Sequence, residues 1–158
     1  MDTTFKHTDA SDLECIQMIA RKTVDHSYRY FLGDETVEYY LNSGRLEAYL
    51  SNNINNTWAL YKDNNVLGFF ICIDNIIDFM MVDADYHRQG LGTKLLKCCE
   101  ALLFENHQVI ALESYEKNSK ACEFYEANNW GKVAKYIDSK NNEVKNIFRK
   151  HLRAEADL

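Results

Sequence analysis

The sequence predicts a single α+β domain, residues 1–158, in which helices cover both faces of a mixed sheet. Three observations support this class. The hydrophobic period changes from helical to strand-like and back along the chain. Three apolar strands follow one another across two tight turns in mid-chain. The length of 158 residues is close to the commonest domain size, and hydrophobic residues make up 46% of it.

The first third of the chain predicts one edge strand and two helical regions. Thr3–His7 is short and suits an edge strand. A helix is expected to begin near Asp12, where capping residues precede an apolar repeat at helical spacing. That repeat consists of Leu13, Ile16, Ile19, Ala20 and Val24. A second helical region spans about Asp34 to Leu50 and is expected to break near Ser43-Gly44.

The middle of the chain predicts an antiparallel meander. Thr57–Tyr61, Val66–Ile73 and Ile76–Val82 are apolar runs of strand length. The turns between them are Asp63-Asn64-Asn65 and Asp74-Asn75. Because the chain contains no proline, its turns must rely on Gly, Asn and Asp.

The last third predicts two helices, a strand and a hairpin. The helix after Gly92 is amphipathic: Leu91, Leu95, Leu96, Cys98, Cys99, Leu102 and Leu103 are expected on its inner side, and Lys94, Lys97, Glu100 and Glu105 on its outer side. Gln108–Glu113 follows as a strand. A helix capped at Asn118-Ser119 is expected to run to Asn128. Trp130–Ile137 and Glu143–Lys150 then form a final hairpin.

Composition excludes several function classes. The net charge of −6 disfavours general nucleic-acid binding, which needs a basic surface. No apolar stretch approaches the roughly 20 residues that span a bilayer, so no membrane segment is expected. The five cysteines show neither a C-x-x-C pair nor a zinc-finger spacing, so no metal site is expected. Unpaired thiols and an N-terminus without signal-peptide features predict a cytoplasmic location.

The segment that carries the chemistry lies between the third meander strand and the next helix. It reads Asp83-Ala84-Asp85-Tyr86-His87-Arg88-Gln89-Gly90-Leu91-Gly92. A helix start presents unpaired N–H groups and partial positive charge, and glycines let the backbone approach an anion closely. Arg88 adds a cation. This combination predicts a pyrophosphate site.

Other glycine loops fit this segment less well. A Walker A loop needs a glycine five residues before Gly92 and a Lys-Thr or Lys-Ser order, but the chain has Thr93-Lys94. A dinucleotide fingerprint needs a third glycine where Leu95 stands. Glu113 does lie where a ribose-binding acid is expected, yet the loop follows a meander instead of opening a βαβ unit. A plain strand-to-helix connection also stays open on this segment alone.

Two segments together resemble the GCN5-related N-acetyltransferase (GNAT) family. His87–Gly92 is similar to its acetyl-CoA loop, [Q/R]-x-x-G-x-[G/A], except that His87 stands where the family has Gln or Arg. Asn118–Trp130 resembles N-x-x-A-x-x-F-Y-x-x-x-G-[FW]. Asn129 replaces the glycine there and is the next best residue for a left-handed helix cap. The resemblance covers the chain from about Trp58 to Trp130.

The resemblance implies a mostly antiparallel sheet with a splay between its fourth and fifth strands, where acetyl-CoA binds as co-substrate. An acceptor amine is expected to attack the thioester directly. The residues expected to bind the cofactor are Met81, Val82, His87, Arg88, Gln89, Gly90, Leu91, Gly92, Thr93 and Asn118. A backbone N–H near Met81 or Val82 is the expected oxyanion donor.

The resemblance also assigns candidate catalytic side chains. Tyr125 matches the family tyrosine that reaches the CoA sulfur, and a phenol keeps its proton at neutral pH for donation to the leaving thiolate. The two candidate bases are Asp78, a carboxylate within an apolar strand that lies near, but not at, the position of a catalytic Glu in some relatives, and Glu113, at the end of the next strand. An ordinary salt bridge or a solvated strand end is the alternative for both. A reaction without a dedicated base, through water, stays an alternative.

The acceptor is less defined. The region before the meander, which forms the substrate wall in the family, is rich in aromatic and acidic residues: His26, Tyr28, Tyr30, Phe31, Asp34, Glu35, Glu38, Tyr39 and Tyr40. Such a wall suits a small cationic amine, and a solvated amphipathic helix explains it equally well. A protein N-terminus or lysine as acceptor, and a non-catalytic acyl-CoA sensor, are the alternatives. The final hairpin suggests a homodimer edge.

Overall fold

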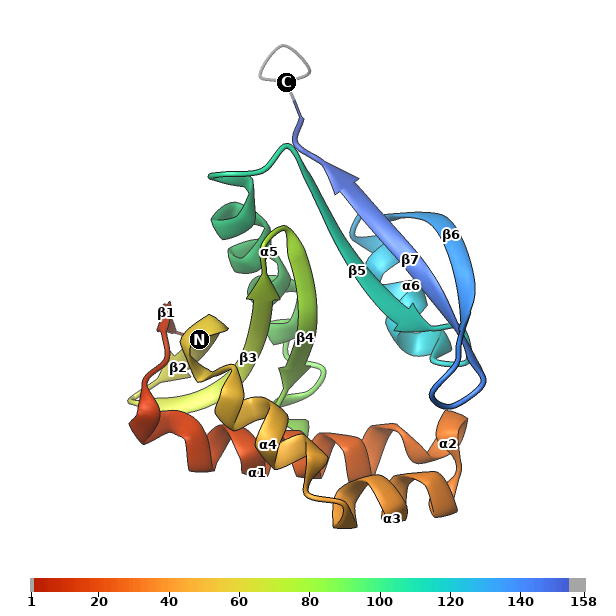
Figure 1. Cartoon of the computed structure of the whole chain (residues 1–158). Helices are drawn as coiled ribbons and strands as arrows, with labels where there is room; N and C mark the ends of the chain where they lie inside the picture. Colours follow the sequence, from red (N-terminus) through yellow and green to blue (C-terminus); the bar gives the residue numbers. More distant parts are fainter. Residues whose placement is uncertain (1, 154–158) are drawn as a thin grey trace. The chain divides into compact units, whose positions relative to one another are not determined.

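The computed structural model describes residues 2–153, which form an α+β fold with a seven-stranded sheet of order β1-β2-β3-β4-β5-β7-β6 (Figure 1). The predicted fold class is confirmed. The strands are β1 (Thr4–His7), β2 (Thr57–Lys62), β3 (Asn65–Ile73), β4 (Ile76–Val82), β5 (Val109–Tyr115), β6 (Gly131–Asp138) and β7 (Glu143–His151). The α-helices are α1 (Leu13–Ser27), α2 (Arg29–Leu32), α3 (Asp34–Asn42), α4 (Arg45–Asn52), α5 (Leu91–Phe104) and α6 (Ser119–Ala127). Three 3-10 turns, η1 (Ala10–Asp12), η2 (Ile54–Asn56) and η3 (Ala84–Tyr86), connect them.

The chain divides into two compact units. Of the described residues, the first unit holds residues 2–72 together with Phe79–Cys98, and the second holds Ile73–Asp78 together with residues 99–153. The single domain expected from the sequence stays a prediction. None of the helices among residues 2–153 combines the length and apolar character needed to cross a membrane.

Strands β2 and β3 of the first unit are joined by a turn of the kind that a chain without proline requires. β1 is an edge strand and pairs antiparallel with β2, from Thr4 opposite Tyr61 to His7 opposite Trp58. β2 pairs antiparallel with β3. The turn between β2 and β3 has positive φ at Asp63 (50°) and Asn64 (69°). Asp and Asn tolerate this left-handed region better than other side chains, so they can replace glycine in the tight hairpin.

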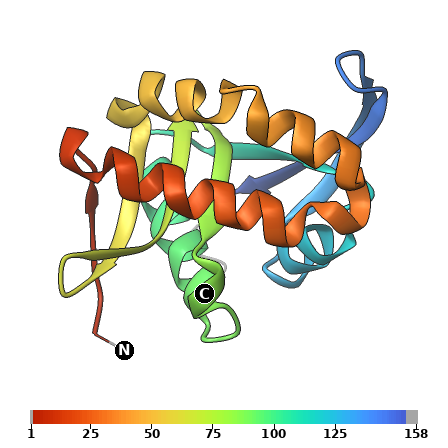
Figure 2. The ribbon, with the colours of Figure 1, turned by 90° about the horizontal axis from the view of Figure 1, so that it is seen from below.

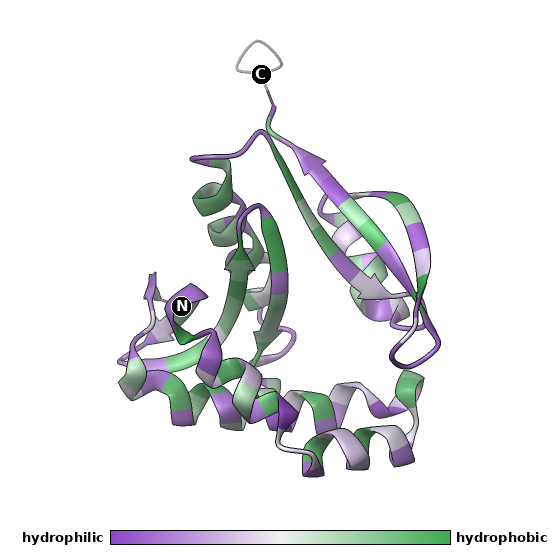
Figure 3. Ribbon diagram, viewed as in Figure 1, coloured by the Kyte–Doolittle hydropathy of each residue, from purple (hydrophilic) through white to green (hydrophobic). Residues whose placement is uncertain are grey.

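Helices α1, α3 and α4 cover one face of the first unit. Figure 2 shows α1 lying alongside α3 and α4, and Figure 3 shows β3 and β4 as mostly hydrophobic ribbons. The buried cluster between helices and strands contains Ile16, Ile19, Ala20, Val24, Val37, Leu41, Leu46, Leu50, Ala59, Tyr61, Val66, Phe69, Ile71 and Met81. The helical spacing of its first four members is the repeat that the sequence predicted for α1.

The first turns of α5 cover the opposite face. Phe69 belongs to the cluster under α1, and the neighbouring Gly68 points the other way because side chains alternate along a strand. A Cβ atom at position 68 would lie 2.9 Å from the Met81 carbonyl oxygen and 3.3 Å from Leu95 Cδ2. Since Leu95 is on α5, the absent side chain of Gly68 lets this helix and β4 approach β3 closely.

The second unit is built on strands β5, β7 and β6. β4 and β5 pair in parallel at Ile76–Ala111 and Ile77–Leu112. Asn75, in the turn before β4, donates its side-chain amide to the Val109 carbonyl at 3.0 Å. β7 then pairs antiparallel with both β5 and β6. The final hairpin predicted from the sequence is confirmed.

Glu100, on α5, is a correction to the sequence prediction, which placed it on the outer side of the helix. Its side chain is only 14% exposed. Its Oε1 accepts hydrogen bonds from Trp130 Nε1 at 2.9 Å and Lys150 Nζ at 2.7 Å. These partners come from the start of β6 and the end of β7, so helical periodicity alone could not show that a carboxylate was needed there.

Three local details of the helices bear on the prediction. The expected break at Ser43-Gly44 is confirmed, with Gly44 in the left-handed region (φ 76°). The short helix α2 was not predicted, because four residues carry no period. Asn118 caps α6 by accepting a hydrogen bond from Ala121 N, and Asn129 adopts φ 69° just beyond the helix, as the sequence predicted.

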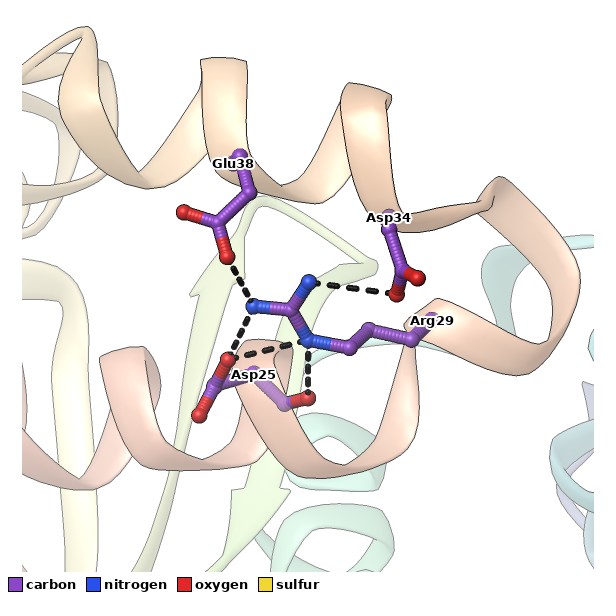
Figure 4. A network of polar contacts seen from close by, with 4 residues as sticks. All are labelled: Asp25, Arg29, Asp34 and Glu38. Atoms are coloured by element: carbon purple, nitrogen blue, oxygen red, sulfur yellow. Dashed lines mark hydrogen bonds and ion pairs between the residues drawn. The ribbon is translucent and has the colours of Figure 1, made fainter.

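A polar network holds α2 against its neighbours (Figure 4). Arg29 donates from Nε to the Asp25 carboxylate at 3.0 Å, from Nη1 to Asp34 at 3.2 Å and from Nη2 to Glu38 at 2.5 Å. These three carboxylates raise the pKa of Arg29, Asp25 most strongly. The guanidinium of Arg29 therefore links the end of α1 to α3 and offsets the repulsion between the three carboxylates.

Replacing Gly68 with alanine is expected to lower the free energy of unfolding by about 1–3 kcal/mol, because the new methyl group meets backbone atoms of β4 that cannot move cheaply. Urea denaturation measures this loss. Gly131→Ala is the matched control, since a Cβ there lies 3.9 Å from the Arg149 carbonyl oxygen, an ordinary contact. Equal stability of the two variants would contradict the close approach at Gly68.

Replacing Arg29 with methionine is expected to lower the melting temperature, because Asp25, Asp34 and Glu38 are left without the cation between them. The loss should shrink in 1 M NaCl, where these exposed charges are screened. Arg45→Met removes an exposed positive charge at the start of α4 and serves as control. A loss for Arg29→Met that is the same at low and high salt would show that the network does not act through charge.

Candidate functional site

The segment of residues 83–92, here called the glycine loop, leads from β4 into α5. Asp83 N donates to the Leu67 carbonyl at 2.8 Å, and Asp83 Oδ1 accepts from Asp85 N at 3.0 Å, which caps the short turn η3. Beyond η3 the backbone takes positive φ at Arg88 (64°) and Gly90 (77°). The left-handed conformation at Arg88 is strained for a residue with a side chain, and such strain clusters at functional sites.

The helix that follows the glycine loop begins at Leu91, so Gly92 lies within its first turn. The first N–H groups of a helix have no acceptor inside it and carry partial positive charge. Residues 87–90 are exposed, whereas Gly92 and Thr93 are half-buried. Arg88 places a guanidinium beside these groups in the chain. The loop therefore offers an accessible, positively polarised backbone turn that suits a pyrophosphate.

His87 makes a contact that the sequence did not predict. Its Nε2 lies 2.8 Å from the carbonyl oxygen of Val82. Because a carbonyl can only accept, this ring nitrogen carries the proton. The ring of His26, on α1, lies 6.3 Å away between centroids. His87 is thus folded back on the end of β4, and Arg88 is left as the loop's nearby cation.

Two of the other predicted cofactor residues, Met81 and Leu91, are buried and can act only through their backbone. Met81 is 4% exposed and belongs to the buried cluster under α1. Leu91 is also 4% exposed. Val82 is half-buried and Gln89 is exposed. The predicted binding of the cofactor by Met81 and Leu91 therefore rests on peptide groups, which agrees with the expectation of a backbone oxyanion donor on β4.

In the second unit the two candidate bases lie side by side. Ile77 pairs with Leu112, so Asp78 and Glu113 come next on neighbouring parallel strands and point to the same face. Both are exposed. Glu113 Oε2 accepts a hydrogen bond of 2.7 Å from the hydroxyl of Tyr136 on β6. This bond is the largest of several effects, burial among them, that raise the pKa of Tyr136 to about 12.

The charge around Asp78 is mixed. Its partly covered carboxyl group is desolvated and faces the negative charge of Glu113, and both effects raise its pKa. The ammonium of Lys145 acts in the opposite direction. Lys145 also forms an ion pair with Asp138 at 3.2 Å and lies 4.9 Å from the centre of the Tyr115 ring. This face of the second unit therefore carries more carboxylates than cations.

Tyr125, the candidate acid, is half-buried on α6. Its ring centroid lies 5.8 Å from that of Phe148 and 6.2 Å from that of Trp130. Burial raises its pKa above the usual value, and the neighbouring thiols Cys99 and Cys122 add to this. Among the described residues, Tyr125 makes ring contacts, and its hydroxyl group forms no hydrogen bond with them. Tyr125 is therefore a protonated phenol at neutral pH.

In the second unit, Tyr125 packs on one face of the sheet, and the candidate bases lie on the other. Glu113 pairs with Ile147 on β7, so the following Phe148 points to the other side of the sheet. Phe148 is fully buried and is the residue that Tyr125 contacts. Tyr125 therefore cannot exchange a proton directly with Asp78 or Glu113 across these strands, and each side must serve a different proton.

Asn118, predicted to bind the cofactor, serves a structural purpose in this structure. Its side-chain oxygen accepts a hydrogen bond of 3.3 Å from Ala121 N at the start of α6. Its own N–H donates to the Tyr115 carbonyl at 3.0 Å. Asn118 thereby fixes the helix that carries Tyr125, and its contact with a cofactor stays a prediction.

Two residues next to the predicted site were missed in the sequence. Lys22, on α1, forms ion pairs with both acids of the glycine loop, and Tyr136 reaches Glu113 from β6. Neither has a local signal, because each meets its partner only through the tertiary fold. Within residues 2–153, His, Cys, Asp and Glu side chains form no group of three or more that is arranged to hold a metal ion.

Comparison with solved structures shows which fold the chain shares. It resembles a GCN5-related N-acetyltransferase from Rhodopseudomonas palustris with a TM-score of 0.81 at 15% identity, covering 96% of this chain and 97% of the other. PaiA N-acetyltransferase from Thermoplasma acidophilum, solved in complex with coenzyme A, gives a TM-score of 0.78 at 19% identity, covering 96% and 100%. The ribosomal-protein-S18-alanine N-acetyltransferase from Escherichia coli gives 0.66 at 18% identity, covering 98% and 97%.

At these identities the structures show a common fold alone. The sequence comparison goes further. The model of the acetyltransferase (GNAT) family matches residues 20–130, which include the glycine loop, both candidate bases and Tyr125. The resemblance drawn from the two sequence motifs is thereby confirmed, and this chain belongs to the acetyltransferase (GNAT) family.

Proposed function

We propose that this chain is an acetyl-CoA-dependent N-acetyltransferase that moves the acetyl group to a primary amine by direct attack. The observation that carries the proposal is the glycine loop: a segment matched by the family model, with positive φ at Arg88 and Gly90, that leads into α5.

None of the five cysteines, all within the described residues, forms a disulfide. This supports the reducing, cytoplasmic location expected from the sequence.

The donor is inferred from the loop and from the relatives. A CoA pyrophosphate would accept hydrogen bonds from the N–H groups at the start of α5, with Arg88 as the neighbouring cation. The similar structure from Thermoplasma acidophilum was solved with coenzyme A, which supports the same donor here. When bound, acetyl-CoA supplies the acyl thioester, and residues of this chain hold it and move the protons.

Tyr125 is proposed to protonate the leaving thiolate. Its pKa is raised by burial, so it keeps its proton over the neutral range and can donate it to a sulfur anion. The ring contacts with Phe148 and Trp130 fix its direction. The two neighbouring thiols, Cys99 and Cys122, disfavour a phenolate at this position still further.

The acceptor amine is proposed to meet Asp78 and Glu113. Two adjacent carboxylates attract a cationic ammonium, and the one with the raised pKa, Asp78, is the better proton acceptor for it. Because Tyr125 lies on the opposite face of these strands, the amine proton and the thiolate proton take separate routes. This arrangement supports direct attack, in which no group has to serve both steps.

A small amine is the favoured acceptor because the face around Asp78 and Glu113 is exposed and acidic. A peptide amine is the second candidate, because one similar structure is named as an alanine N-acetyltransferase of a ribosomal protein. Thiol release from acetyl-CoA, measured over polyamines, aromatic amines and peptides with free N-termini, separates the two. CoA binding without turnover on any of them would instead indicate an acyl-CoA sensor.

Replacing Arg88 with glycine is expected to raise the dissociation constant for CoA about tenfold, because it removes a charged donor while glycine accepts the φ of 64°. Isothermal titration calorimetry measures this change. Arg88→Lys should retain part of the affinity, and Arg45→Gln, at an exposed arginine of α4, should bind like the wild type. Unchanged binding by Arg88→Gly would place the pyrophosphate elsewhere.

Replacing Tyr125 with phenylalanine is expected to lower kcat by about 10²- to 10⁴-fold, because the proton donor is lost, and to leave the affinity for CoA unchanged. The ring contacts that hold α6 persist in this variant. Tyr39→Phe, at a tyrosine that is 68% exposed on α3, is the control. A Tyr125→Phe enzyme with wild-type kcat would mean that the thiolate leaves without this acid.

A further inference from the structure

Lys22 links α1 to the start of the glycine loop. Its Nζ lies 2.5 Å from Asp83 Oδ1 and 3.0 Å from Asp85 Oδ2. Asp83 follows the last residue of β4 and its side chain is only 12% exposed, whereas that of Asp85 is 74% exposed. One ammonium therefore contacts both acids that flank the first residue of η3.

The same acids fix the backbone from which the loop departs. Asp83 N donates to the Leu67 carbonyl on β3, and Asp83 Oδ1 accepts from Asp85 N. Tyr86 N in turn donates to the Asp83 carbonyl at 2.9 Å. The ion pairs of Lys22 thus attach η3 to α1. The turn is otherwise held by its hydrogen bond to β3 and by hydrogen bonds within the turn.

Lys22 also neutralises the negative charge of Asp83 and Asp85. Asp83 and Asp85 are the acids of the glycine loop, and across residues 2–153 the ion pairs recorded for them are both with Lys22. Without the ammonium, two negative charges would stand at the base of a loop proposed to bind an anion, and like charges repel over such distances. The hydrogen bond to Asp83 raises the pKa of Lys22, so the ammonium persists at neutral pH.

We propose that Lys22 is a positioning residue for the CoA phosphates: it fixes η3 against α1 and neutralises Asp83 and Asp85, so that the glycine loop can bind an anion. The inference rests on the proposed function, because it assumes that this loop binds CoA. It adds a residue of α1 to a site for which the sequence predicted residues of β4, the glycine loop, the start of α5 and Asn118.

The test compares CoA affinity, by calorimetry, and steady-state kinetics in the wild type and four variants. Lys22→Met keeps most of the side-chain stem but removes the charge, and is expected to raise both the Kd for CoA and the KM for acetyl-CoA about tenfold with kcat nearly unchanged. Lys22→Arg should restore most of the affinity. Lys62→Met, at an exposed lysine of β2, is the charge-matched control and should bind CoA like the wild type.

The fourth variant, Lys22→Met with Asp85→Asn, separates the effect of charge from that of packing. If Lys22 acts by neutralising the acids, removing the exposed carboxylate should recover part of the lost affinity. A merely structural lysine would lower the melting temperature but would not be rescued in this way. Wild-type affinity in Lys22→Met, or no recovery in the double variant, would overturn the inference and leave the proposed function standing.

A further variant covers the case in which Lys22→Met does not fold. Asp85→Asn alone changes an exposed side chain and leaves Lys22 with surplus charge, so it should bind CoA more tightly than the wild type at low salt. Equal or weaker binding would overturn the inference. A wild-type chain that shows no CoA binding would overturn the proposed function itself, and this inference with it.

Discussion

The close approach of α5 to β3 and β4 is the constraint on which the candidate cofactor site depends. It exists because position 68 carries no side chain: a Cβ there would meet the Met81 carbonyl oxygen, the Val82 Cα and the Leu95 side chain. With the helix held this close, the chain has only residues 83–90 in which to leave β4 and enter α5. The reversal is made by a 3-10 turn followed by positive φ at Arg88 and Gly90. The start of α5, where the first N–H groups of a helix have no acceptor within it, follows this reversal directly.

The two faces of the sheet in the first unit contribute differently, one to stability and one to the candidate cofactor site. The face under α1, α3 and α4 is a large apolar cluster that supplies stability. On the other face, α5 packs against β3, and the glycine loop leads from β4 into this helix. The helices on the first face also form ion pairs: Lys22 of α1 with the acids at η3, and Arg29 of α2 with Glu38 of α3. The second unit separates its candidate proton donors and acceptors by strand alternation, with Tyr125 on one face and Asp78 and Glu113 on the other.

Much of this could be predicted from the sequence because the relevant signals are local. Apolar patterns and turn residues together located the seven strands and every α-helix except α2, and the Asn residues at turns and caps adopt the backbone conformations expected of them. The two motifs located the glycine loop and Tyr125. What could not be predicted depends on strand register and helix docking. Glu100 was placed outside because Trp130 and Lys150 are distant in sequence, and Lys22 and Tyr136 gave no signal for the same reason.

The central claim is that an acyl-CoA pyrophosphate binds at the start of α5. The most direct measurement is a titration of ¹⁵N-labelled protein with CoA, followed through the backbone amide resonances. The account predicts that the largest shifts fall on residues 88–94, and that the amides of the β2–β3 turn at Asp63 and Asn64 do not move. Saturable binding whose largest shifts lie outside the glycine loop, or no shifts at millimolar CoA, would contradict it.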